Sequence, residues 1–133
     1  MKGILPSLSR LGGCESGAAA VEFALIALAL ILVAIGTIEF GRGLQLRNEL
    51  SFAADFGARK VLLEPTVSVT VIEDAIRSAL IQAQPDLLTV TLGTETADGA
   101  EYRTISVAYP LTLTIPGVTG ETLTLSVSRR VPL

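Results

Sequence analysis

The chain has 133 residues, of which half are hydrophobic, and its 10 basic and 13 acidic side chains leave a formal net charge of −3. This length suggests one small domain with an appendage rather than two full domains. The scattered basic residues argue against a nucleic-acid-binding surface. The single cysteine excludes an internal disulfide and a cysteine-based metal site. The mean hydropathy of +0.59 is high for a soluble protein, and most of this hydrophobic excess falls between Ala18 and Ile38.

Residues 1–17 are predicted to form a short leader, which carries Lys2 and Arg10. A proline and several glycines argue against a stable helix there. Ala18–Ile38 follows as an apolar run of 21 residues whose only charge is Glu22. As a helix this run would be ~31 Å long, close to the ~30 Å thickness of the hydrocarbon core of a bilayer. We therefore predict that residues 18–38 are the transmembrane half of a long helix.

The charges around the predicted span indicate its orientation. Positive charges in the leader precede the span, and they favour an N-terminus in the cytoplasm. The chain is then predicted to cross the membrane once, with its C-terminal domain on the extracytoplasmic side.

Residues 39–63 are predicted to continue the helix as its extracytoplasmic half, since no proline interrupts this stretch. The ion pairs Glu39 with Arg42 and Asp55 with Arg59 have helical neighbour spacing, and we expect them on the polar side. Apolar and small residues recur at spacings of three and four and predict a buried stripe: Leu46, Leu50, Ala53, Ala54, Gly57 and Val61.

Residues 64–133 are predicted to form a domain with a helix and an antiparallel sheet. A second, shorter helix is predicted over Val71–Gln84, with Pro85 ending it. Its apolar face would hold Ile72, Ala75, Ile76, Ala79 and Leu80.

Alternation of apolar and polar residues then predicts three strands. Turns between them are predicted at Asp98–Gly99 and at Pro116–Gly117 with Gly120. The predicted fold class is α+β, with a long N-terminal transmembrane helix, a short second helix and a small three-stranded antiparallel sheet covered by the long helix. The apolar face of the sheet would hold Leu88, Val90, Leu92, Ile105, Val107, Tyr109, Leu111, Leu113, Ile115, Leu123, Leu125 and Val127.

Gly17, Ala18, Glu22 and Phe23 stand at the beginning of the apolar span. An ionised carboxylate in a membrane helix costs about 2.5–3.5 kcal/mol at the bilayer centre and less near the interface. Cleavage between Gly17 and Ala18 would create an amine, with an unperturbed pKa of about 8, four residues before Glu22. That amine could balance Glu22 within one chain or between neighbouring chains. The alternative is an ordinary acid near a helix N-terminus, which the helix dipole favours by about 0.3–1 kcal/mol.

These residues resemble the N-terminal signature of the TadE-like family. The shared pattern is Gly17, four residues, Glu22–Phe23, an apolar span, Glu39–Arg42 (Glu-Phe-Gly-Arg) and a closing Gly57–Arg59 (Gly-Ala-Arg). The resemblance implies a pilin-like protein of a bacterial inner membrane. It would be a minor pseudopilin that acts in the assembly of tight-adherence, or Flp-type, pili.

The resemblance also implies partners and processing. A prepilin peptidase would cleave after Gly17 and leave Ala18 first in the mature protein, with Glu22 and Phe23 serving recognition and assembly. Other pilins, pseudopilins and the pilus assembly platform would be its partners, and no cofactor, nucleic acid or small-molecule substrate is implied. Ala18 stands where type IV pilins usually have Phe, which leaves N-methylation open.

Other interpretations of the N-terminal half remain. Leu11–Cys14 resembles a lipobox, although the apolar stretch that should precede it is broken. Ala34–Gly36 resembles a signal-peptidase site, which would release a soluble domain. The chain could also be an uncleaved, membrane-anchored periplasmic module that binds an envelope partner. Gly36 with Gly41 could form a close helix–helix contact in lipid.

No catalytic constellation is evident in the sequence. The chain has no histidine, and it lacks a nucleophile elbow, a phosphate-binding loop and a set of ligands with metal-site spacing. The adjacent basic residues Arg129 and Arg130 are predicted to form a solvated strand edge rather than a binding patch. We therefore expect a structural protein rather than an enzyme.

Overall fold

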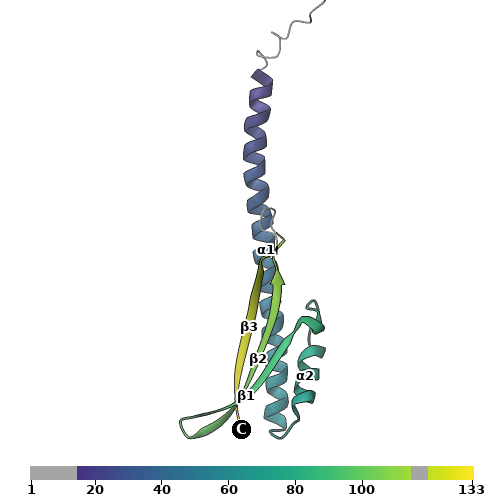
Figure 1. Ribbon diagram of the computed structural model, residues 1–133, viewed down its shortest axis with the longest axis vertical. Helices are drawn as coiled ribbons and strands as arrows, with labels where there is room; N and C mark the ends of the chain where they lie inside the picture. The colour runs from purple at the N-terminus through teal and green to yellow at the C-terminus, as the bar shows by residue number, and fades with distance from the viewer. Residues whose placement is uncertain (1–14, 115–119) are drawn as a thin grey trace, which may run out of the picture.

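The computed structural model describes residues 15–114 and 120–133. One helix, α1 (Glu15–Leu63), runs almost the whole length of the molecule, and all other elements pack around its distal, C-terminal half (Figure 1). The other elements are α2 (Val69–Ser78), a 3-10 turn (Pro85–Leu87), β1 (Thr89–Ala97), β2 (Ala100–Thr112) and β3 (Thr122–Pro132). The predicted α+β fold class is confirmed.

The helix α1 ends at Leu63 as predicted but begins at Glu15, three residues before the expected Ala18. Leader residues 1–14, with the lipobox-like segment that ends at Cys14, lie outside the described residues.

The three strands form an antiparallel meander in the order β1-β2-β3, as predicted. The β1–β2 turn is Asp98–Gly99, where both residues have positive φ, 53° and 77°, the geometry of a tight two-residue hairpin turn. Of the residues predicted for the second turn, Gly120 has a φ of 83°. Ile115, Pro116 and Gly117 lie outside the described residues.

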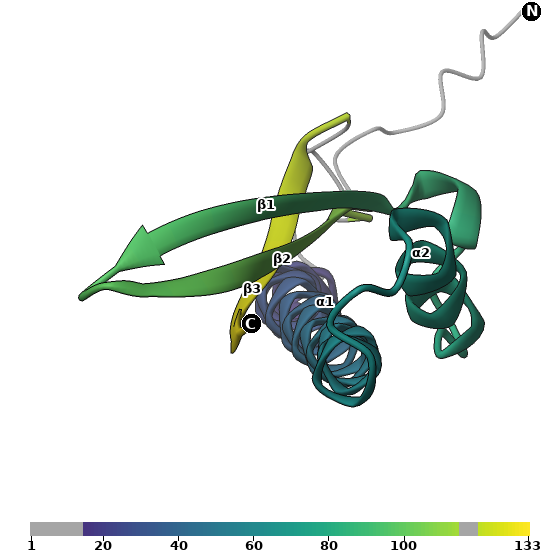
Figure 2. The same cartoon turned by 90° about the horizontal axis from the view of Figure 1, so that it is seen from below.

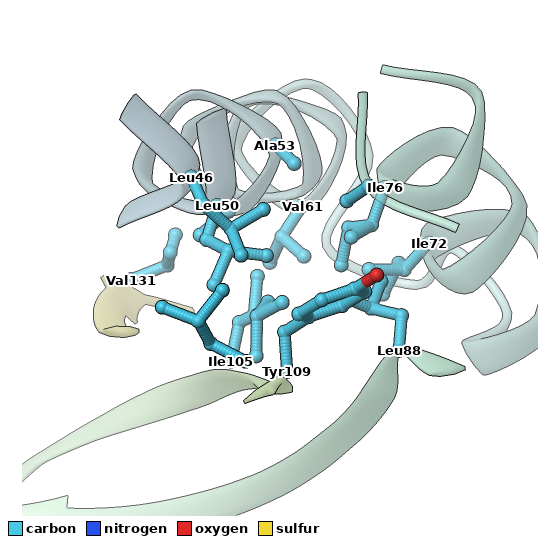
Figure 3. Close-up of a cluster of buried hydrophobic side chains, with 14 of the residues drawn as sticks. Leu46, Leu50, Ala53, Val61, Ile72, Ile76, Leu88, Ile105, Tyr109 and Val131 are labelled. Atoms are coloured by element: carbon cyan, nitrogen blue, oxygen red, sulfur yellow. The ribbon is translucent and has the colours of Figure 1, made fainter. Parts of the chain in front are cut away.

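The sheet lies across one side of α1, and α2 packs beside the same half of the helix (Figure 2). The predicted stripe on α1 is buried and meets the predicted apolar face of the sheet (Figure 3). Leu123 departs from the prediction, since 51% of its surface is exposed, whereas Leu125 and Val127 are half-buried. The largest fully buried side chains are Leu50, Ile72, Ile76, Ile105, Val61 and Val107.

The second helix is shorter than predicted, because α2 ends at Ser78 rather than at Gln84. The side chain of Ser68 caps its N-terminus and accepts a hydrogen bond from the backbone N–H of Val71. Beyond Ser78, the chain turns so that a carboxylate oxygen of Glu49 on α1 accepts hydrogen bonds from the backbone N–H groups of residues 81–83. Those amides would otherwise continue the helix, so a contact with α1 ends it before the proline is reached.

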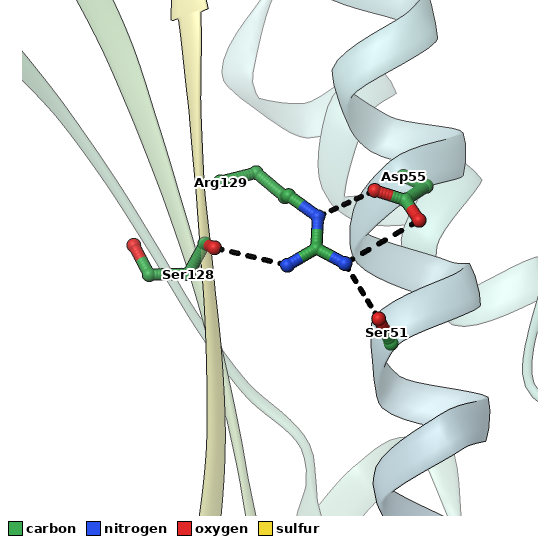
Figure 4. Close-up of polar contacts among 4 residues, drawn as sticks. All are labelled: Ser51, Asp55, Ser128 and Arg129. Atoms are coloured by element: carbon green, nitrogen blue, oxygen red, sulfur yellow. Dashed lines mark hydrogen bonds and ion pairs between the residues drawn. The ribbon is translucent and has the colours of Figure 1, made fainter.

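An arginine on β3 connects the sheet to α1 (Figure 4). The guanidinium of Arg129 donates to both carboxylate oxygens of Asp55 and to the hydroxyl of Ser51. Arg129 lies opposite Ile105 in the β2–β3 register, which places it on the side of the sheet that faces the helix. The prediction of a solvated strand edge holds for Arg130, whose side chain is 51% exposed on the edge strand β3, whereas Arg129 is turned to the helix and only 33% exposed. The prediction that Asp55 pairs with Arg59 is wrong, because Asp55 pairs with Arg129.

Gly57 of α1 lies in close contact with α2. A Cβ on Gly57 would lie 2.7 Å from Cγ1 and 2.8 Å from Cδ1 of Ile76, which is fully buried, so the Ile76 side chain would have to shift within the packed core. Overpacking of this kind costs about 1–3 kcal/mol.

We expect Gly57→Ala to lower the free energy of unfolding by at least about 1 kcal/mol, despite the better helix propensity of alanine. Urea unfolding of the full chain in detergent, followed by the fluorescence of its two tyrosines, would measure this change. Gly41→Ala is the matched control, because a Cβ there meets nothing within 4 Å. Equal stability of the two variants would contradict the close packing.

The Glu49 contact predicts a pH dependence of stability. Burial raises the pKa of the Glu49 carboxyl, but the three amide hydrogen bonds together outweigh it, so this pKa lies below its ordinary value of 4.5. A lowered pKa in the folded state stabilises the fold above pH 4.5, and this stabilisation is lost as the pH falls through the folded-state pKa.

We therefore expect the difference in unfolding free energy between the wild type and Glu49→Gln to be constant above about pH 4.5 and to shrink at lower pH. Urea unfolding at a series of pH values would measure it. A difference that stays constant down to pH 3 would argue against a charged carboxylate at this contact.

Candidate membrane-anchoring and processing site

The N-terminal half of α1 has no cover from the other residues that the structure describes. From Gly17 to Ile38 every residue is exposed or half-exposed, and this part of the helix projects beyond the sheet (Figure 1). Soluble proteins rarely expose apolar patches larger than a few hundred Å². In the part of the chain that the structure describes, one helix is long and apolar enough to cross a membrane, and this helix begins with the bare segment. The exposed large apolar residues of the segment are Val21, Phe23, Leu25, Ile26, Leu28, Leu30, Ile31, Leu32, Val33 and Ile38.

The covering of α1 begins immediately after this segment. Glu39 is buried, and Leu46 and Leu50 continue the buried side toward the distal end. The bare and covered parts of one continuous helix therefore meet near Ile38, the residue at which the apolar run ends in the sequence.

Glu39 and Arg42 form the predicted ion pair at this junction, with 2.8 Å between a carboxylate oxygen and Nη2. The prediction that the pair lies on the polar side is wrong for Glu39, which is only 9% exposed. Arg42 also donates a hydrogen bond to the backbone carbonyl of Thr112, at the end of β2. The pair therefore connects α1 to the near end of the sheet, which is the end closest to the apolar segment, where β2 ends and β3 begins. Arg42 also neutralises the Glu39 carboxylate beside the apolar segment.

Thr112 and Glu49 are contact residues that the sequence analysis missed. The Arg42 bond reaches the backbone of Thr112, and the carboxylate of Glu49 binds backbone amides of residues 81–83. Contacts with a backbone leave no mark on the side-chain pattern of the partner, so no sequence signal could have found them.

Gly17 and Ala18 lie in the first turn of α1, because the helix begins at Glu15. Both are exposed, and a Cβ at Gly17 would meet nothing within 4 Å. The peptide bond between them is thus on the surface of the described chain, within a helical turn.

Glu22 and Phe23 lie one turn further along, and both are exposed. Among the described residues, Glu22 makes no ion pair.

The described residues contain no group of His, Cys, Asp and Glu that could hold a metal ion. Ala34, Gly36 and Gly41 lie on the uninterrupted helix, and a Cβ at either glycine would meet nothing within 4 Å. The side chains at the N-terminal half of α1 can thus make contacts outside the chain, but they assemble no reactive site within it.

Fold and surface together define a class of protein: an α+β domain built on the distal half of one helix, whose bare proximal half is suited to anchor it in a membrane. A family model described as TadE-like protein matches residues 17–59. The match begins at Gly17, ends at Arg59 and contains Glu22–Phe23 and Glu39–Arg42, so the predicted resemblance is confirmed over this segment, about a third of the chain.

The TadE-like family consists of pilus-associated structural proteins, and the match supports a role in a pilus system. No curated protein and no solved structure matched the chain.

Proposed function

We propose that this protein is a minor pseudopilin that a prepilin peptidase processes and that acts in the assembly of tight-adherence, Flp-type pili. One observation carries the proposal: residues 18–38 of α1 are apolar and bare, with a single carboxylate, Glu22, near the start of this segment. The match of residues 17–59 to the TadE-like family supports the same assignment.

The apolar segment has two possible coverings outside the chain, lipid and other helices, and a pseudopilin uses both in turn. Residues 18–38 would first lie in the inner membrane, with the leader in the cytoplasm and the sheet in the periplasm. They would then pack with helices of other pilins and pseudopilins. Packing of small and branched side chains drives association of helices in lipid, because lipid chains are as apolar as leucine.

Cleavage between Gly17 and Ala18 would supply the charge that Glu22 needs. The new amine and Glu22 stand four residues apart, on the same face of a helix. A carboxylate removed from water is strongly disfavoured unless it is paired. The amine of the same chain or of a neighbouring chain would therefore make the bundle favourable and fix its register.

The processing step predicts the mass of the protein from its native host. We expect the mature chain to begin at Ala18, because the peptidase would remove residues 1–17. Gly17→Val should leave the uncleaved mass, since the fold has open space at this glycine and only the peptidase requires a small residue there. Intact-mass spectrometry measures both.

The control is Gly41→Val, which has equally open surroundings and should be cleaved normally. The other possible masses separate the alternatives. A chain that begins at Thr37 is a secreted domain, a lipidated Cys14 marks a lipoprotein, and an intact Met1 marks an uncleaved anchored module. Each of these three results would refute the processing step.

The charge-pairing step predicts the effect of removing the carboxylate. We expect Glu22→Ala to leave membrane insertion unchanged, because the substitution makes the segment more apolar, and to reduce pilus formation severalfold. Membrane fractionation and a count of surface pili by electron microscopy measure the two effects.

Glu22→Asp is the matched control, since it keeps the charge and should retain most pili. Normal pilus formation in Glu22→Ala would count directly against a paired carboxylate, even if the chain is still cleaved at Gly17.

A further inference from the structure

A groove between α1 and the near end of the sheet plays no part in the function proposed above. It has a volume of about 310 Å³ and is apolar along most of its wall. Gly36, Gly43 and Leu44 of α1 line one side, and Leu113, Leu123 and Leu125 line the other. The groove explains why Leu123 is half-exposed, since the sheet does not close onto the helix at this end.

The position of the groove points to lipid as its occupant. Gly36 lines the groove and also belongs to residues 18–38, so the groove opens directly onto the apolar surface that would face the bilayer. Its long side runs along α1 from Gly36 to Arg47, a rise of about 16 Å, away from the predicted edge of the hydrocarbon core. An acyl chain can enter such a groove without leaving an apolar environment.

The charges at the groove fit a phospholipid. Glu39 lines the groove, but Arg42 already neutralises its carboxylate. Arg47 stands at the far end, and within the described residues it has no ion-pair partner. Helical side chains point toward the N-terminus of their helix, so the long side chain of Arg47 can extend toward the membrane surface. A cation beside an apolar groove complements a lipid phosphate joined to its acyl chain.

We propose that this groove binds one acyl chain of a phospholipid from the adjacent leaflet, with Arg47 at the phosphate. The inference rests on the proposed membrane span of residues 18–38. Glu121 is exposed, and its backbone carbonyl accepts a hydrogen bond from the backbone N–H of Leu113. A charged side chain at this position would keep the near ends of β2 and β3 out of the hydrocarbon core, at the level of the lipid headgroups, and the acyl chain would extend into the groove.

The chain contains no tryptophan, so single tryptophan residues can report their own contact with lipid. Three leucines that are all more than half exposed supply matched sites: Leu123 at the groove, Leu28 in the proposed span and Leu63 at the distal end of α1. Leu63 lies ~37 Å beyond Ile38 along the helix. Each full-length variant is reconstituted in vesicles of phosphatidylcholine and phosphatidylglycerol with brominated acyl chains, which quench tryptophan on contact.

We expect strong quenching for Leu28→Trp, at least roughly half as much for Leu123→Trp and almost none for Leu63→Trp. If Leu123→Trp is quenched no more than Leu63→Trp while Leu28→Trp is quenched, the span stands and the groove proposal falls. If Leu28→Trp also escapes quenching, the proposed span and the groove proposal fall together. A third outcome would also overturn the proposal. If the emission of Leu123→Trp is blue-shifted, is not quenched by bromine and varies with the protein-to-lipid ratio, the groove is covered by a second copy of the chain.

A second comparison separates a lipid in the groove from a hairpin that merely lies near the bilayer. Gly36→Leu, at a position where a Cβ meets nothing within 4 Å, should fill the mouth of the groove and reduce the quenching of Leu123→Trp at least twofold. Gly41→Leu, which has equally open surroundings but does not line the groove, should leave that quenching unchanged. Equal quenching in the two variants would show that the groove holds no acyl chain.

Discussion

A helix with two different coverings is the constraint on which the rest of this structure depends. The distal half of α1 turns a stripe of small and apolar residues toward the sheet and α2, and this contact buries the core. The proximal half carries apolar residues on all its sides and receives no cover from the described chain. Because both halves belong to one uninterrupted helix, the domain and its anchor form one continuous element.

Polar contacts along α1 fix where the other elements lie on it. From the near end to the distal end, Arg42 binds the end of β2, Glu49 binds the loop after α2, and Asp55 binds Arg129 of β3. A small sheet that rests on a helix only through apolar side chains could slide along it at little cost, since the hydrophobic effect is not directional. These hydrogen bonds are directional and therefore select one position.

Much of this fold could be predicted, because periodicity is a local property of the chain. The stripe of Leu46, Leu50 and Val61 and the alternating face of Ile105 and Val107 were both correctly assigned to the core. The errors have a common cause. The end of α2, the burial of Glu39 and the partner of Asp55 depend on residues distant in sequence, and a rule of helical neighbours cannot detect them. The cleavage and assembly residues, Gly17 to Phe23, stay predictions, although the family match contains them.

The sequence by itself determined the two α-helices and three strands, the single apolar segment that could cross a membrane and its lone charge, because these follow from local residue order and composition. Only the tertiary structure decided which charged groups face each other, where α2 stops and that a groove stays open between Gly36 and Leu123. Those features depend on how far the sheet reaches along α1. That distance is set by packing between segments dozens of residues apart, so no local pattern encodes it.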